Sequence, residues 1–78
     1  MDNQAKVIEI ISRITGSTVK IDPDESLFDS GILDSFALTD VIGEVEKEFS
    51  IKVPDADLTP RKFNTISRIV SYIESHSS

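Results

Sequence analysis

Three segments of the chain carry hydrophobic residues at the spacing of an amphipathic helix. They span residues 3–15, 35–49 and 64–74, and polar residues occupy most of the positions in between. Apolar residues at i, i+3, i+4 and i+7 lie on one face of a helix, so each stripe predicts a helix that turns this face toward a core. The stripes are Val7, Ile8, Ile11 and Ile14; Leu38, Val41, Ile42, Val45 and Phe49; and Ile66, Ile69, Val70 and Ile73.

The segments between these stripes contain residues that interrupt helices. Gly16 ends the first helix, and residues 16–34 show no strong period but hold the turn-forming runs GST, DPDES and DSG. We expect an ordered loop here, fastened by its apolar residues. These residues are Ile21, Leu27, Phe28, Ile32 and Leu33.

The remaining pieces are short. An extended segment, SIKVP, precedes "LTPRKF", which predicts a short helix with Thr59 as N-cap and Pro60 at its first position. Thr65 is the expected cap of the last helix, which we expect to fray into a mobile tail at "SHSS". The predicted fold is all-α, a four-helix bundle of three longer helices and one short helix, with a long ordered loop between the first and second.

Length and composition limit the class of protein. The 78 residues suit a single domain, residues 1–78, which buries roughly 60% of its unfolded surface, and the chain has no cysteine to form disulfides. Its start, "MDNQAKVIEI", lacks the pattern of a signal peptide, and no apolar run reaches the roughly 20 residues of a membrane span. We expect a cytoplasmic protein that does not enter the membrane.

The charge is uneven along the chain. The net charge is -6, and residues 21–50 carry nine acidic residues but only one basic residue. Phosphates would be repelled by this charge, which argues against nucleic acid as a ligand and favours basic protein partners. On the predicted second helix, a period of about 100° per residue turns Phe36 and Asp40 away from the apolar stripe.

Ser35, in "GILDSF", is the most conspicuous reactive residue. A serine nucleophile needs a neighbouring base, but the only histidine, His76, lies in the expected tail, and Lys47 lies more than three turns along the same helix. The run "DPDESLFDSGIL" begins like a calcium loop, but leucines replace the required glycine and the final glutamate. The sequence therefore predicts neither a catalytic residue nor a metal site.

A local interpretation of "DS" is helix capping by Asp34 or Ser35, because a side-chain oxygen and a negative charge both suit the positive end of a helix. A serine at a helix N-terminus is also well placed to hold a phosphate ester, since free amides favour an anion there. Ser35 is therefore a candidate modified residue, and the outward Phe36 beside an acidic face is a candidate contact residue.

The segment "LFDSGILDSFALTDVIGEVEKEFSIKVP" resembles the acyl carrier proteins and the related carrier domains of fatty acid, polyketide and nonribosomal peptide assembly. The specific part is the G-x-x-D-S step at Gly31, Asp34 and Ser35, followed by an apolar residue. The acidic second helix, the "IKVP" after it and the "FNT" before the last helix extend the likeness over nearly the whole chain.

The resemblance implies that Ser35 receives 4'-phosphopantetheine from coenzyme A through a phosphopantetheinyl transferase, with Asp34 assisting that enzyme. The arm then holds an acyl or aminoacyl group as a thioester and shuttles it between enzymes, and the carrier, expected to be a monomer, catalyses nothing. The resemblance also implies that the second helix docks basic partner enzymes. The candidate docking residues are Phe36, Asp40, Glu44, Glu46 and Glu48.

The subtype and the cargo stay open at this point. Phe36, Gly43 and Lys47 depart from the carriers of fatty acid synthesis, while the "LDS" step and Phe63 before "NT" are similar to D-alanyl carrier proteins and other stand-alone carriers of specialised pathways. We favour a specialised carrier. The alternative is an acidic helical adaptor that binds a basic partner and uses Ser35 only as a cap or a phosphorylation site.

Overall fold

The computed structural model describes residues 3–16 and 18–76, and the described part is all-helical. Its long helices are α1 (Asn3–Thr15), α2 (Ser35–Phe49) and α4 (Ile66–His76), and α3 (Pro60–Phe63) is a single short turn. A 3₁₀ turn, η1 (Asp55–Asp57), was not predicted. The predicted bundle of three longer helices and one short helix, with a long loop after the first, is confirmed.

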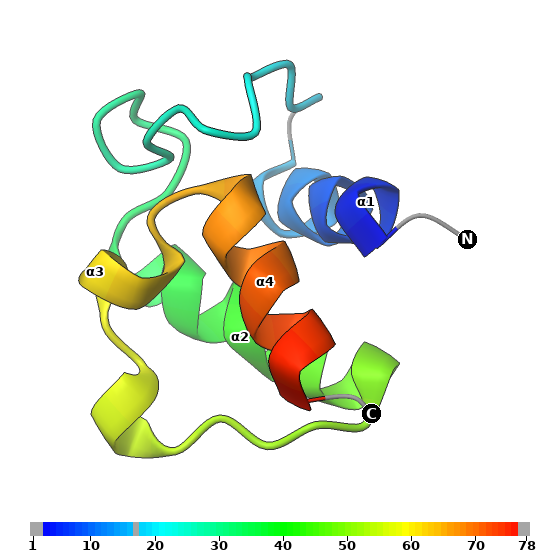
Figure 1. Cartoon of the computed structure of the whole chain (residues 1–78). Coiled ribbons are helices and arrows are strands. Elements are labelled where there is room, and N and C mark those ends of the chain that lie inside the picture. Colours follow the sequence, from blue (N-terminus) through cyan, green and yellow to red (C-terminus); the bar gives the residue numbers. More distant parts are fainter. Residues whose placement is uncertain (1–2, 17, 77–78) are drawn as a thin grey trace.

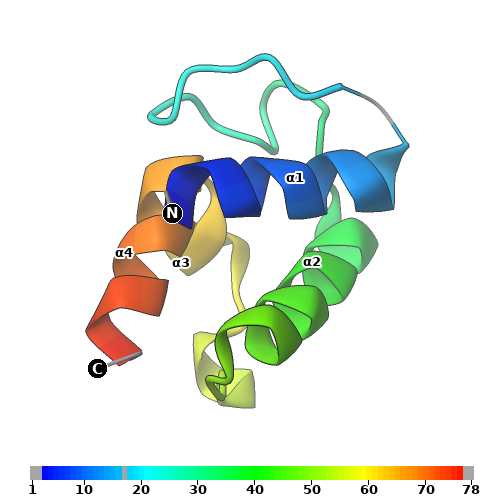
Figure 2. The same ribbon diagram turned by 90° about the vertical axis from the view of Figure 1, so that its right-hand side faces the viewer.

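The helices surround one apolar core. In Figure 2, α1 runs across the top of the bundle, and α2 and α4 descend from it on opposite sides. Each long helix turns one stripe inward, and the fully buried side chains of the core are all hydrophobic. The buried residues are Val7, Ile10 and Ile11 of α1, Leu38, Val41, Ile42 and Val45 of α2, Phe63 of α3, Ile66, Ile69 and Ile73 of α4, and Val19, Leu27, Leu33 and Ile51 of the connections.

The stripe of α1 differs from the predicted one at three positions. Ile10 is buried with 1% of its surface exposed, whereas Ile8 and Ile14 are only half-buried at the edge of the core. Ile8 lies three residues before Ile11 and Ile10 lies three residues after Val7, so the sequence pattern fits either. Contact of α1 with both α2 and α4 selects the face that carries Val7, Ile10 and Ile11.

The loop between α1 and α2 lies across one end of the bundle (Figure 1) and is tied to the start of α4. The amide of Leu27 donates to the carbonyl of Asn64 at 2.7 Å, and the amide of Ser67 donates to the carbonyl of Pro23 at 3.0 Å. Leu27 and Leu33 are buried, as predicted, and Val19 also enters the core. The loop is therefore ordered by backbone hydrogen bonds and apolar anchors together.

The helix termini mostly follow the predicted caps. Gly16 adopts a φ of 73° just after α1, a conformation that glycine reaches without strain. Thr65 accepts a hydrogen bond from the amide of Arg68 at 3.0 Å. Thr59 occupies the N-cap position of α3, but its side chain forms no capping hydrogen bond. The expected fraying at "SHSS" is wrong for Ser75 and His76, because α4 continues through His76, whereas Ser77 and Ser78 lie outside the described residues.

Candidate functional site

The candidate site lies at the first turn of α2. Asp34 is the N-cap residue, and its Oδ1 accepts a hydrogen bond from the amide of Ala37 at 2.8 Å. The carbonyl of Asp34 accepts from the amide of Leu38 at 2.9 Å. Ser35 is therefore the first residue of the helix itself, and its side chain is exposed. The cap is Asp34, so the hydroxyl of Ser35 is not needed for capping.

The preceding turn positions this serine outside the core. The carbonyl of Leu27 accepts from the amides of Ile32 and Leu33, each at 3.0 Å, and Gly31 allows the sharp turn with a φ of 80°. Leu27 and Leu33 are then buried at the two ends of the turn. Because Leu33 is fixed in the core, the chain leaves the interior directly before the cap residue and presents Ser35 to solvent.

The first turn of α2 has the features needed to hold an anion on Ser35. The first helical hydrogen bonds use the amides of Ala37 and Leu38, which leaves the amides of Ser35 and Phe36 at the positive end of a helix of 15 residues. Free amides and the helix dipole favour a phosphate group at such a terminus. The site therefore fits a phosphodiester carried by the hydroxyl of Ser35.

The outward face of α2 begins with Phe36. Its side chain is 85% exposed, and it is the only large hydrophobic residue so exposed in the part of the chain that the structure describes. Asp40, Gly43 and Lys47 are exposed on the same face, at i+4, i+7 and i+11 from Phe36. The prediction that Phe36 and Asp40 point away from the core is confirmed. The surface pairs one aromatic ring with charges of both signs.

The other acids of α2 occupy different environments. Glu46 turns back to the following connection, where its Oε2 accepts from the amide of Val53 at 2.7 Å. Glu48 forms an exposed ion pair with Lys6 of α1 at 3.2 Å. Glu44 is half-buried. The two ion pairs found among residues 3–16 and 18–76 involve neither Asp40 nor Glu44. Asp40 is thus exposed and lies outside both of these ion pairs.

The histidine of the chain lies far from Ser35. His76 ends α4, where its ring stacks on Tyr72 with a centroid distance of 4.0 Å and its Nδ1 lies 2.9 Å from the carbonyl oxygen of Tyr72. Figures 1 and 2 both show the end of α4 at the opposite side of the bundle from the start of α2.

Within the described residues there is also no group of three or more His, Cys, Asp or Glu side chains that could hold a metal.

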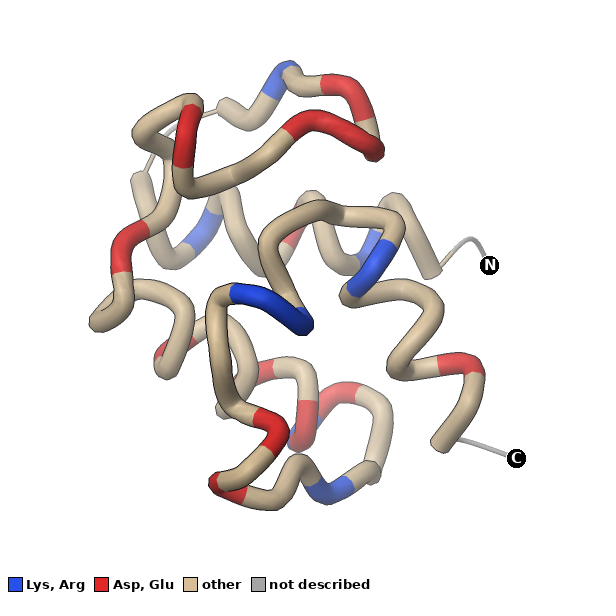
Figure 3. Tube along the Cα trace, turned by 60° about the vertical axis from the view of Figure 1, so that its left-hand side comes forward, with Lys and Arg blue, Asp and Glu red and all other residues tan. Residues whose placement is uncertain are grey.

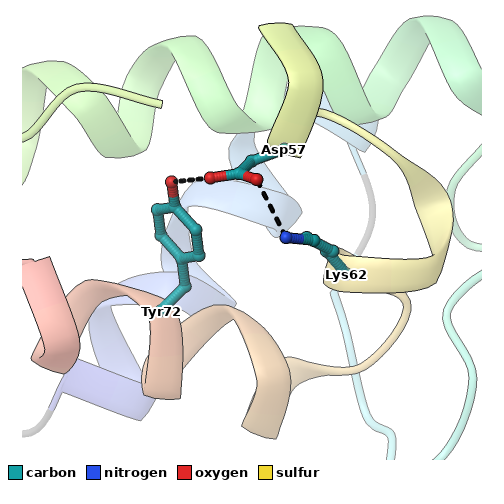
Figure 4. Close-up of polar contacts among 3 residues, drawn as sticks. All are labelled: Asp57, Lys62 and Tyr72. Atoms are coloured by element: carbon teal, nitrogen blue, oxygen red, sulfur yellow. Dashed lines mark hydrogen bonds and ion pairs between the residues drawn. The ribbon is translucent and has the colours of Figure 1, made fainter. Parts of the chain in front are cut away.

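A polar cluster that the sequence analysis missed joins η1, α3 and α4 (Figure 4). The carboxylate of Asp57 accepts from the hydroxyl of Tyr72 at 2.9 Å and pairs with the ammonium of Lys62 at 2.8 Å. The Lys62 and Tyr72 hydrogen bonds lower the pKa of Asp57 below its ordinary value of 3.8. Burial, together with the hydrogen bond to Asp57, raises the pKa of Tyr72 above 10.0. No periodic pattern in the sequence links these three residues.

None of the described helices is both long and apolar enough to cross a membrane.

Comparison with known proteins places this site in context. The family model described as a phosphopantetheine attachment site matches residues 5–73. The chain is 41% identical over 70 residues to the D-alanyl carrier protein of Streptococcus sanguinis, which covers 90% of this chain and 89% of that protein. It is 38% identical over 74 residues to the D-alanyl carrier protein of Streptococcus pyogenes serotype M5, a match that covers 95% of this chain and 94% of that protein. It is 29% identical over 75 residues to the D-alanyl carrier protein of Leuconostoc mesenteroides, a match that covers 96% of each chain.

Proposed function

The chain belongs to the phosphopantetheine attachment-site family of carrier proteins, and from this premise we propose that its 4'-phosphopantetheine arm is attached to Ser35. The observation that supports this position is the exposed hydroxyl at the first residue of α2, beside two free amides and outside any capping role. The arm supplies the thiol that this cysteine-free chain lacks, and an acyl or aminoacyl group is held on that thiol as a thioester.

We further propose that the chain itself catalyses no step. The Oγ of Ser35 attacks the phosphorus on the pantetheine side of the coenzyme A diphosphate, the bond to the other phosphate breaks and adenosine 3',5'-bisphosphate leaves. A base of the phosphopantetheinyl transferase takes the hydroxyl proton. Asp34 fixes the start of α2 through its bond to Ala37 and presents a carboxylate beside the reacting hydroxyl. The amides of Ser35 and Phe36 then stabilise the phosphate negative charge. The compartment we propose for this attachment is the cytoplasm.

The cargo we propose is a D-alanyl group. This proposal is supported by the relatives from two Streptococcus species and from Leuconostoc, each named a D-alanyl carrier protein and each matched over nearly its whole length. The partners are then an enzyme that loads an activated amino acid onto the thiol and an enzyme that removes it. A carrier of fatty acid or polyketide intermediates is the competing assignment.

Intact-mass measurement tests the attachment site. Wild-type protein incubated with coenzyme A and a broad-specificity transferase should gain one phosphopantetheine mass, while Ser35→Ala should gain none and keep its helical circular dichroism spectrum. Ser75→Ala, which changes an exposed serine of α4, is the matched control and should load normally. Loading of Ser35→Ala would disprove the attachment site, and no loading of wild type would favour the acidic adaptor instead.

The docking surface we propose is the outward face of α2, with Phe36 as its apolar contact and Asp40 and Glu44 as its charges. Glu46 and Glu48 remain candidate docking residues. Glu46 also bonds to the amide of Val53 and Glu48 pairs with Lys6, so both have structural roles as well. Charges at the rim of an interface steer the encounter more than they add affinity, which suits a monomeric shuttle that must release each partner.

Replacing Phe36 or Asp40 tests this surface. Phe36→Ala and Asp40→Asn should each slow aminoacyl loading of the pantetheine-bearing protein several-fold, because they remove contact area and a steering charge. Both side chains are exposed, so the free energy of unfolding should change by less than about 0.5 kcal/mol. Glu9→Gln, which neutralises an exposed acid on α1, is the charge-matched control. Equal loading rates for Asp40→Asn and Glu9→Gln would contradict a role for Asp40.

A further inference from the structure

An open groove of about 690 Å³ lies along α4, at the side where α4 meets α3 and the loop around Asp24. Ser67, Ser71 and Ser75 recur at every fourth position of α4, and their small side chains leave the space free. The adjoining row of Arg68, Tyr72 and His76 forms one wall. The groove includes no residue of the proposed attachment site or of the α2 docking surface.

The α3–α4 side of the groove is basic, because Lys62 and Arg68 line it and Arg61 lies beside them, although the whole chain carries a net charge of -6. Figure 3 shows the Lys and Arg segments of α3 and α4 beside each other, and these helices pack together. The guanidinium of Arg68 donates to the carbonyl of Arg61 at 3.1 Å, which holds its charge at the groove. The ion pairs among the described residues include neither arginine, whereas Lys62 pairs with Asp57. Asp24 is the acid on the opposite wall.

We propose that this groove binds an acidic segment of a partner protein, with carboxylates of the segment pairing with Arg68. A guanidinium matches a carboxylate in a two-pronged geometry, and the serine and threonine hydroxyls supply further hydrogen bonds to a peptide. The space is far larger than one small anion and is open along the helix.

The inference can be tested with the full chain and a synthetic peptide. An end-capped hexaglutamate peptide titrated into ¹⁵N-labelled protein should shift the amide resonances of Ser67, Arg68, Ser71 and Tyr72, and the shifts should shrink as salt is added. Hexalysine should not shift them. Shifts confined to other parts of the chain would overturn the proposal. So would anionic lipid vesicles or inorganic polyphosphate producing the groove shifts as strongly as hexaglutamate does.

Single substitutions give the direction of each charge effect. Arg68→Gln should weaken hexaglutamate binding by about three- to tenfold, whereas Asp24→Asn should strengthen it by about two- to threefold, since each is a change of one charge at the groove. Lys52→Gln removes the same charge as Arg68→Gln at an exposed position outside the groove, and it should change the affinity little. If Arg68→Gln and Lys52→Gln weakened hexaglutamate binding equally, the effect would depend on net charge alone, and the proposed binding site would be wrong.

Two further variants complete the test, one that fills the groove and one that removes the proposed attachment residue. Ser71→Phe fills the groove at an exposed position without a change of charge, and it should abolish the peptide-induced shifts while the unfolding transition is retained. Unchanged binding by a folded Ser71→Phe would contradict binding in the groove. Ser35→Ala should bind hexaglutamate like wild type, so failure of this inference is distinguishable from failure of the attachment site.

Discussion

At the scale of single residues, Asp34 has a structural role that is separable from the proposed functional one. Its carboxylate caps α2 through the amide of Ala37 at 2.8 Å, and its negative charge lies at the positive end of the helix. The same carboxylate is exposed beside Ser35, the proposed attachment residue. A substitution that keeps the cap but removes the charge distinguishes the two roles.

Asp34→Ala should lower the free energy of unfolding by about 1 kcal/mol, because the Ala37 amide loses its acceptor. Asp34→Asn keeps an acceptor and should lose at most roughly 0.3–1 kcal/mol of charge–dipole stabilisation. Urea denaturation measures both. We expect both variants to be loaded more slowly by the transferase. A normal loading rate for Asp34→Asn would show that Asp34 acts only as a cap.

At the scale of elements, α2 is defined by its two ends. Asp34 begins it, and Ser50 ends it with a left-handed backbone, at a φ of 56° and a ψ of 44°. This conformation lets the amides of Ser50 and Ile51 both donate to the carbonyl of Glu46. A residue with a Cβ is strained in the left-handed conformation, whereas glycine is not. Ser50 therefore places a small amount of strain at the C-terminal end of α2.

Ser50→Gly should therefore stabilise the protein. Relief of the left-handed strain exceeds the extra entropy of glycine in the unfolded chain, and we expect a gain of about 0.5–1 kcal/mol in the free energy of unfolding, measured by urea denaturation. Ser50→Ala keeps a Cβ and is the control, with little expected change. A loss of stability in Ser50→Gly would show that the serine side chain itself stabilises the end of α2.

At the scale of the whole molecule, one polar cluster ties the long connection after α2 to the last helix. Asp57 in η1 contacts Lys62 of α3 and Tyr72 of α4, and the ring of Tyr72 also packs edge-on against Phe63 at 4.9 Å. The connection has few buried residues of its own, chiefly Ile51. The cluster therefore fixes the position of η1 and α3 between α2 and α4.

The cluster predicts a pH dependence of stability. The folded pKa of Asp57 is lowered, so its contribution is present above the unfolded value of about 3.8 and is lost as the pH falls through the folded pKa. The difference in stability between wild type and Asp57→Asn should be constant at neutral pH and shrink below about pH 4. Tyr72→Phe should raise the pKa of Asp57 toward its ordinary value, as measured by NMR titration. An unchanged pKa would contradict the Tyr72 hydrogen bond.

The bounds of α1 and α2 followed from local rules. A 3.6-residue period, a capping aspartate and turn-forming glycines act over a few neighbours, so "GILDSF" predicts a helix that starts at Asp34 and Ser35. The family resemblance combined this stretch with the acidic second helix, the "IKVP" after it and the "FNT" before the last helix. The match to residues 5–73 confirms the resemblance.

Other features depend on which segments meet. Some of them bring together residues of different segments: the bond from Val53 to Glu46, the Asp57 cluster and the α4 groove. Another is the choice of Ile10 over Ile8, which decides between two residues that fit the same helical period. The serine row of α4 is visible in the sequence, but a row of small residues indicates a groove only when another element forms the opposite wall. The sequence by itself determined the three long helices and the capped start of α2, because short-range periodicity and capping set both. Only the tertiary structure decided which charges are paired and which stay free, because that depends on contacts between elements.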